Sequence, residues 1–147
     1  MKERVRKTRR AWNEAEHAHF LTYSCHQRLP LLTRRWVIEA MERVRRKQDV
    51  ALWAYVIMPE HVHILLHPRR PRYEMCTILA GLKFPVARAA KEYLLRNEQS
   101  EWLTRLTVQS GRRTLFRSWQ PGGGYDHNVF KEKTLPAITD YIPANPV

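Results

Sequence analysis

The sequence predicts an α+β fold of ferredoxin-like type, in which an antiparallel β-sheet carries helices packed on one face. Three observations lead to this prediction. The expected elements follow the order strand, helix, strand, strand, helix, strand, helix. The second and third strands are joined at Pro59-Glu60, and so tight a link implies an antiparallel hairpin. The two long helices each carry one apolar stripe. The other face of the sheet would then be free for a ligand.

Composition favours one globular domain with a real core. The chain has 147 residues, of which 44% are hydrophobic, so it is not a disordered basic tail. No apolar run approaches the ~20 residues of a membrane-spanning helix, and the first residues lack the apolar core of a signal peptide. The two cysteines, Cys25 and Cys76, are far apart, which argues against a disulfide scaffold and fits a reducing cytoplasm.

Positive charge favours an anionic partner. The net charge is +12, and arginine strongly outnumbers lysine. Because arginine binds phosphate through two donors and stacks on bases, this excess favours nucleic acid, with an anionic membrane surface as the alternative. Residues 1–16 form a basic arm ahead of the domain at 17–147. This arm is either a solvated extension or a phosphate-contacting segment, whose candidate residues are Arg4, Arg6, Arg9 and Arg10.

The first half of the chain has clear signals. Residues 17–25 are aromatic and β-prone and predict a strand. For His17 and His19, at its start, a structural or surface role is favoured over metal binding. Thr33 is a good N-cap for a helix over residues 33–48. Two strands, 51–58 and 61–67, follow.

The second half is less regular. A helix is expected over 74–96, kinked at Pro85. Residues 97–113 are polar and predict a loop or short turns, 114–120 a last strand, and 135–142 a helix, while Val129 and Phe130 could add a short strand. The basic residues of this half that could lie along a DNA path are Lys83, Arg88, Arg112 and Arg113.

A His-x-His pair begins the strand at 61–67. Side chains alternate between the faces of a strand, so His61 and His63 share a face, with their Cα atoms roughly 6.6 Å apart. Val62, Ile64 and Leu66 then point into the core. Two imidazoles at this separation could converge on one metal ion, or they could be half-exposed strand histidines with ordinary hydrogen bonds.

Two blocks of sequence resemble a known family. Met58-Pro59-Glu60-His61-Val62-His63-Ile64-Leu65-Leu66 resembles the HUH motif (His, hydrophobic, His) of single-tyrosine transposases. Trp119-Gln120-Pro121-Gly122-Gly123-Gly124-Tyr125-Asp126 and Asp140-Tyr141-Ile142-Pro143-Ala144-Asn145-Pro146-Val147 resemble later blocks of the same family. The branch with the greatest resemblance is the REP-associated tyrosine transposases (REP: repetitive extragenic palindrome).

The resemblance implies a fold, a site and a reaction. The fold would be the ferredoxin-like (RRM-like) HUH nuclease fold. Tyr141 matches the nucleophile, and His61, His63 and Asn145 match the ligands of Mg²⁺ or Mn²⁺. The tyrosine would attack single-stranded DNA beside hairpins or palindromes, giving a 5′-phosphotyrosine intermediate and strand transfer. A cytoplasmic, nucleoid-associated bacterial protein is expected, as a monomer or a homodimer.

The sequence departs from the family pattern at two points. Pro143 stands where relatives usually have a histidine, and it disturbs the helical spacing between Tyr141 and Asn145. The chain also ends at Asn-Pro-Val, where relatives continue, so a truncated domain is expected. Alternatives to the enzyme are therefore a catalytically decayed module that binds single-stranded or hairpin DNA, and a structural zinc protein, which the lack of cysteines near the histidines disfavours.

Overall fold

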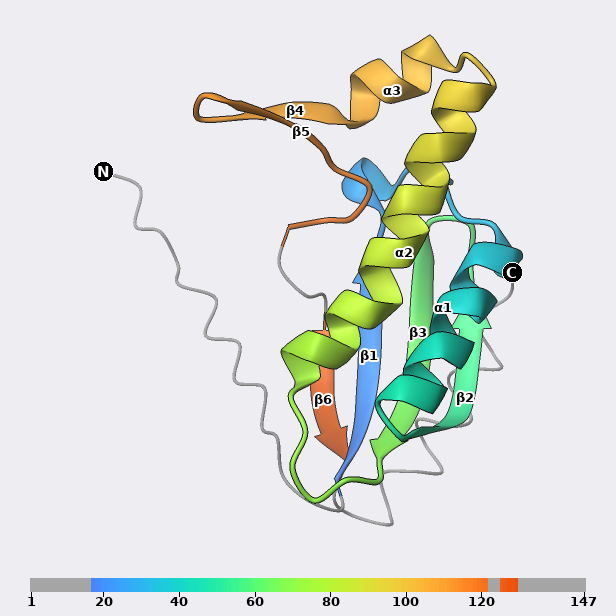
Figure 1. Ribbon diagram of the computed structural model, residues 1–147, viewed down its shortest axis with the longest axis vertical. Helices are drawn as coiled ribbons and strands as arrows, with labels where there is room; N and C mark the ends of the chain where they lie inside the picture. Colours follow the sequence, from blue (N-terminus) through green and yellow to red (C-terminus); the bar gives the residue numbers. More distant parts are fainter. Residues whose placement is uncertain (1–16, 122–124, 130–147) are drawn as a thin grey trace.

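The computed structural model describes residues 17–121 and, for the backbone alone, residues 125–129. Its main layer is a four-stranded antiparallel sheet in the order β2–β3–β1–β6 (Figure 1). The elements β1, α1, β2, β3, α2 and β6 follow the βαββαβ order of a ferredoxin-like fold, so the predicted fold class is confirmed. The strands of this sheet are β1 (Ala18–Ser24), β2 (Val50–Ile57), β3 (His61–Pro68) and β6 (Tyr125–Val129).

Two helices, α1 (Arg34–Lys47) and α2 (Met75–Arg96), pack side by side on one face of the sheet (Figure 1). As predicted, Thr33 begins α1, and its hydroxyl accepts the backbone N–H of Trp36 at 3.4 Å. The apolar stripes of both helices bury against the sheet and exclude water. The core between these layers includes Leu21, Tyr23, Val37, Met41, Val44, Val62, Ile64, Leu66, Met75, Ile78, Leu82 and Val86.

The two helices approach each other closely at Gly81. A Cβ atom at this position would lie 2.7 Å from Cγ2 of Val44, so only glycine fits without movement. One turn further on, α2 continues through Pro85, although proline supplies no backbone N–H. The helix predicted over 74–96 is therefore observed as one element.

The turn between β2 and β3 is fixed from two sides. After β1, a short 3-10 helix, η1 (His26–Arg28), leads toward α1. The backbone N–H of Cys25 donates to the carbonyl of Glu60 at 2.8 Å, and that of Leu32 donates to the carbonyl of Pro59 at 2.9 Å. These bonds hold the start of β3, and hence the His-x-His pair, against the end of β1.

Beyond α2 the structure corrects two predictions. Residues 97–113, expected as a loop or short turns, contain α3 (Ser100–Leu106) and β4 (Thr107–Ser110). The segment 114–120, expected as the last strand of the sheet, contributes only to β5 (Arg113–Phe116), which pairs with β4 in a separate two-stranded sheet. The fourth strand of the main sheet is β6, near the short strand expected at Val129 and Phe130. The expected helix 135–142 and the arm 1–16 lie outside the described residues.

The described helices differ from membrane-spanning segments. None of them combines the length and the apolar character that crossing a bilayer requires.

Candidate functional site

The His-x-His pair lies on the sheet face opposite the helices. Val62 and Ile64 belong to the core beneath α1 and α2, so the alternating His61 and His63 point to the other face, as predicted. The pairing of β1 with β3 places Thr22 directly across from His63. The site is therefore built on two adjacent central strands, which are rigid elements of the fold.

The two imidazoles converge. Their Nε2 atoms are 3.1 Å apart, and the ring planes are nearly perpendicular, at 85°. Both residues are buried, with exposed fractions of 9% for His61 and 5% for His63. They are thus neither half-exposed nor independent, and each ring directs the same nitrogen at a shared point.

Each ring is also held from its far side. Nδ1 of His61 lies 2.9 Å from Oε1 of Glu60, and Nδ1 of His63 lies 2.9 Å from Oγ1 of Thr22. Partners of this kind fix the ring orientation and leave Nε2 for a ligand. The carboxylate can only accept, so Nδ1 of a neutral His61 carries the hydrogen and its Nε2 presents a lone pair.

One arrangement of hydrogens satisfies the whole chain of contacts. Nδ1 of His61 donates to Glu60, Nε2 of His63 donates to Nε2 of His61, and the hydroxyl of Thr22 donates to Nδ1 of His63. A single proton then occupies the space between the two Nε2 atoms. A cation placed there would replace that proton, with the Thr22 hydroxyl turning to accept from Nδ1 of His63.

Burial keeps His63 neutral. The loss of solvent, followed by the proximity of His61, lowers the pKa of His63 from 6.5 to about 4. The ring of Phe20 contributes to this burial, since it stacks on His63 with centroids 5.9 Å apart and planes within 4°. At neutral pH the imidazole therefore has an unprotonated nitrogen, which is the form that binds metals.

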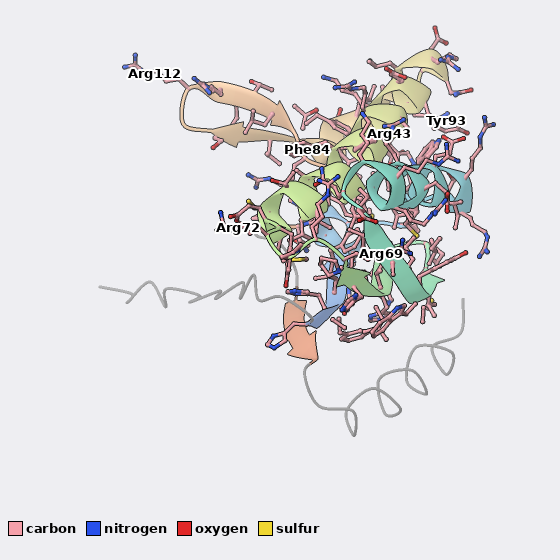
Figure 2. All side chains as sticks on the ribbon, turned by 60° about the horizontal axis from the view of Figure 1, so that its bottom comes forward. Arg43, Arg69, Arg72, Phe84, Tyr93 and Arg112 are labelled. Atoms are coloured by element: carbon pink, nitrogen blue, oxygen red, sulfur yellow. The ribbon has the colours of Figure 1, made fainter. Side chains whose placement is uncertain are left out.

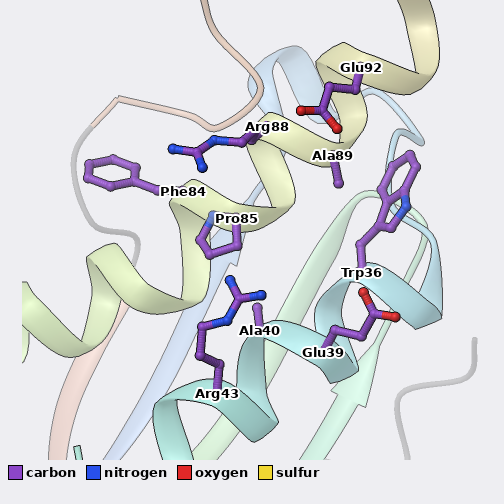
Figure 3. Close-up of a pocket in the computed structure, with 9 residues that line it drawn as sticks. All are labelled: Trp36, Glu39, Ala40, Arg43, Phe84, Pro85, Arg88, Ala89 and Glu92. Atoms are coloured by element: carbon purple, nitrogen blue, oxygen red, sulfur yellow. The ribbon is translucent and has the colours of Figure 1, made fainter. Parts of the chain in front are cut away.

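The other predicted site residues are divided between described and undescribed segments. Arg88, Arg112 and Arg113 are exposed, as a DNA contact requires. Arg88 lines a groove of about 260 Å³ between α1 and α2, together with Arg43, on the helical side of the sheet (Figure 3). The remaining predictions fall on residues outside the described part of the chain: Tyr141, Asn145, Arg4, Arg6, Arg9 and Arg10.

The prediction of Lys83 as a solvated DNA contact is wrong. Its side chain is buried, with Nζ 5.6 Å from the ring centroid of Tyr23. The reason is helical spacing: position 83 is four residues after Leu79 and three before Val86, so it lies on the apolar face that α2 presents to the sheet. His19 is buried as well and hydrogen-bonds to the hydroxyl of Tyr73 at 2.7 Å, which is the structural role expected for it.

Two residues of the site were not predicted from sequence. The sequence indicates Glu60 only as part of a turn, although a carboxylate next to a His-x-His pair is a signal that identifies it. Thr22 carries no comparable signal, because only the register of β1 against β3 brings it to His63. Among the described residues, no three His, Cys, Asp or Glu side chains form a group able to hold a metal, so the histidines offer two donors there.

Comparisons with known proteins point to one kind of fold. No family model and no curated protein matches the chain. Among solved structures, it is similar to a REP-associated tyrosine transposase bound to a REP hairpin, with a TM-score of 0.71 and 20% identity over 94% of this chain and 71% of that one. It is also similar to a candidate transposase from Deinococcus radiodurans, with a TM-score of 0.51 and 20% identity over 94% and 96% of the two chains. The chain therefore has the α+β fold of a REP-associated tyrosine transposase.

Proposed function

We propose that the protein cleaves and rejoins single-stranded DNA beside hairpins, as a metal-dependent tyrosine transposase. The observation that carries this proposal is the 3.1 Å separation of the Nε2 atoms of His61 and His63, with Glu60 and Thr22 behind them. The fold supports it, because a structure with the same fold is a tyrosine transposase bound to a REP hairpin.

The donor geometry suits a divalent ion. Two ligands about 2.1 Å from one ion are separated by roughly 3.0 Å at right angles and by roughly 3.4 Å in a tetrahedron. The observed 3.1 Å lies between these values. With Asn145 as the third donor that the resemblance implies, the set is two imidazole nitrogens and one amide oxygen. This set can bind either Mg²⁺ or Mn²⁺. Mn²⁺ is favoured because it tolerates nitrogen ligands better than Mg²⁺ does.

The proposed reaction uses Tyr141 as the nucleophile. Its phenolic oxygen forms a bond to phosphorus while the bond from phosphorus to the 3′ oxygen breaks. The phenol gives up one proton and the leaving oxygen gains one, so the products are a 5′-phosphotyrosine and a free 3′-hydroxyl. The reverse attack by a 3′-hydroxyl rejoins strands. A bound divalent ion would polarise a non-bridging phosphate oxygen.

The test is covalent trapping on a denaturing gel. The protein is incubated with Mn²⁺ and a single-stranded DNA that carries a hairpin, and a protein–DNA adduct is expected. Tyr141→Phe should abolish the adduct, and His61→Ala/His63→Ala should reduce it at least 100-fold. Tyr93→Phe is the matched control, since Tyr93 is an exposed tyrosine of α2 and its loss should change nothing.

The absence of an adduct from the wild type would contradict the proposal as stated. If DNA binding persisted in that case, the protein would be a non-catalytic binding module. The variant Pro143→His then tests whether the protein has lost its catalytic activity. An adduct that forms only in this variant would identify position 143 as the residue at which activity was lost.

A further inference from the structure

The hairpin of β4 and β5 extends away from the rest of the molecule (Figure 1). Its strands pair only with each other within the described chain. Residues 107–116 are exposed apart from Val108 and Phe116, which are half-buried, and even Leu115 is 41% exposed. A two-stranded hairpin that is exposed over most of its length contributes little to stability, so the core does not explain its presence.

The base of the hairpin is nonetheless firmly fixed. The backbone N–H of Arg117 donates to the carbonyl of buried Leu106 at 2.7 Å. Just beyond, the indole N–H of Trp119 donates to the backbone carbonyl of Lys83 in α2 at 2.9 Å. The hairpin therefore projects in a direction that the core determines.

The projecting end is basic. Between Glu101 and Asp126 the chain has no acidic residue. Gly111, with a φ of 62°, and Arg112 form the two-residue turn, and Arg113 follows directly. Figure 2 shows Arg112 at the far tip, pointing away from the molecule. An anionic partner is the one whose charge complements this tip.

The two faces of the hairpin carry different groups. Val108 lies opposite Leu115, and Ser110 lies opposite Arg113. These two pairs are on the same face of the hairpin, which therefore carries apolar side chains and a guanidinium group. On the other face, the amide of Gln109 donates to the hydroxyl of Thr114 at 2.9 Å. Arginine, glutamine and exposed apolar groups are the types that contact guanine, adenine and the thymine methyl in the major groove of DNA.

We infer that the β4–β5 hairpin enters the major groove of a B-form DNA stem, with Arg112 and Arg113 at its leading end. The major groove admits a two-stranded β-ribbon. A single strand is a poorer match, because binding to single strands uses exposed aromatic platforms, whereas the aromatic residue of this hairpin, Phe116, is half-buried at its base. This inference rests on the proposed function, since it says which element of the protein binds the double-stranded stem of the DNA substrate.

The test compares two DNA probes by fluorescence anisotropy. One is a DNA hairpin with a stem of about 10 base pairs, one helical turn. The other is an unstructured strand of equal length. Arg112→Ala/Arg113→Ala should lower affinity for the stem about 10-fold or more and leave the unstructured strand within about 3-fold. The matched control, Arg35→Ala/Arg46→Ala, removes the same charge from exposed positions on α1. Its affinities for the stem and for the unstructured strand should equal those of the wild type.

A base analogue identifies the groove. Replacing guanine by 7-deazaguanine in the stem removes a major-groove acceptor, so it should weaken the wild type and leave the double variant unchanged. An RNA stem of the same sequence has a major groove that side chains cannot enter, so the double variant should bind it as the wild type does.

Equal losses on the stem and the unstructured strand, equal losses on DNA and RNA stems, or no loss at all would each overturn the inference. The melting temperature should be unchanged in the double variant, because both arginines are exposed. Failure of the proposed function is seen separately in the trapping assay, as absence of the Tyr141 adduct from a protein whose stem binding still depends on Arg112 and Arg113.

Discussion

Oε1 of Glu60 lies 2.9 Å from Nδ1 of His61, the residue that follows it in the chain. Successive side chains in a strand point to opposite faces, but Glu60 lies in the bend just before β3, and this lets its carboxylate reach the imidazole. The contact makes Nδ1 the protonated nitrogen and directs the lone pair of Nε2 toward His63. Glu60 is thus a positioning residue for the proposed metal site.

Removing this carboxylate should weaken metal binding. For Glu60→Ala we expect a 10- to 100-fold, order-of-magnitude loss of Mn²⁺ affinity in isothermal titration, because partners behind a histidine ligand typically contribute that much. Glu60→Gln keeps an acceptor oxygen and should lose less. Glu42→Ala, on α1 and therefore on the other side of the sheet, is the control and should bind as the wild type does. Wild-type affinity in Glu60→Ala would show that the contact does not support a metal site.

Stability of the metal-free protein should depend on pH through His63. Its pKa is about 4 in the folded protein and 6.5 when unperturbed, so between these values the unfolded chain binds the proton more tightly. The stabilisation is complete above pH 6.5 and is lost as the pH falls toward 4, by roughly 1–3 kcal/mol.

Urea unfolding in EDTA from pH 7 to pH 4 measures this effect. His63→Gln should show a shallower decline than the wild type, since protonation of other groups is common to both proteins. Identical pH profiles would mean that His63 does not titrate as its buried position requires.

The contact between α1 and α2 predicts an effect on packing. Gly81→Ala places a methyl group 2.7 Å from Cγ2 of Val44, which is buried and β-branched and cannot turn away easily. We expect a loss of about 1–2 kcal/mol, because the overlap outweighs the better helix propensity of alanine. In a double-mutant cycle, Val44→Ala should recover about 1 kcal/mol or more in the Gly81→Ala background. Simple additivity would show that the helices separate freely.

The sequence is most informative where burial of one face makes apolar residues recur at regular spacing. The alternation of His61, Val62 and His63 was predicted because one face of β3 is packed against helices, and the helix over 33–48 was predicted from its cap at Thr33. The convergence of the Nε2 atoms depends on rotamers and on the strand register, which place Thr22 behind His63. Neither is encoded in local sequence, so Thr22 was missed.

The sequence was least informative beyond α2, and for Lys83. The helix α3 has seven residues, too few for an apolar stripe, and β4–β5 is exposed on both faces, so no alternation marks it. Lys83 was assigned by its charge, whereas its position on the helix controls its burial. The local sequence does not identify these short elements or the burial of Lys83, because both depend on tertiary packing.

Electron paramagnetic resonance of bound Mn²⁺ shows whether the nitrogens of His61 and His63 bind the ion. If His61 and His63 both bind the ion through Nε2, pulsed spectra of the wild-type protein should show couplings to two directly bound nitrogens. His61→Ala and His63→Ala should each remove one of them, and the double variant both. Bound Mn²⁺ with no nitrogen coupling in the wild type, or couplings that persist in the double variant, would contradict the assignment of this site.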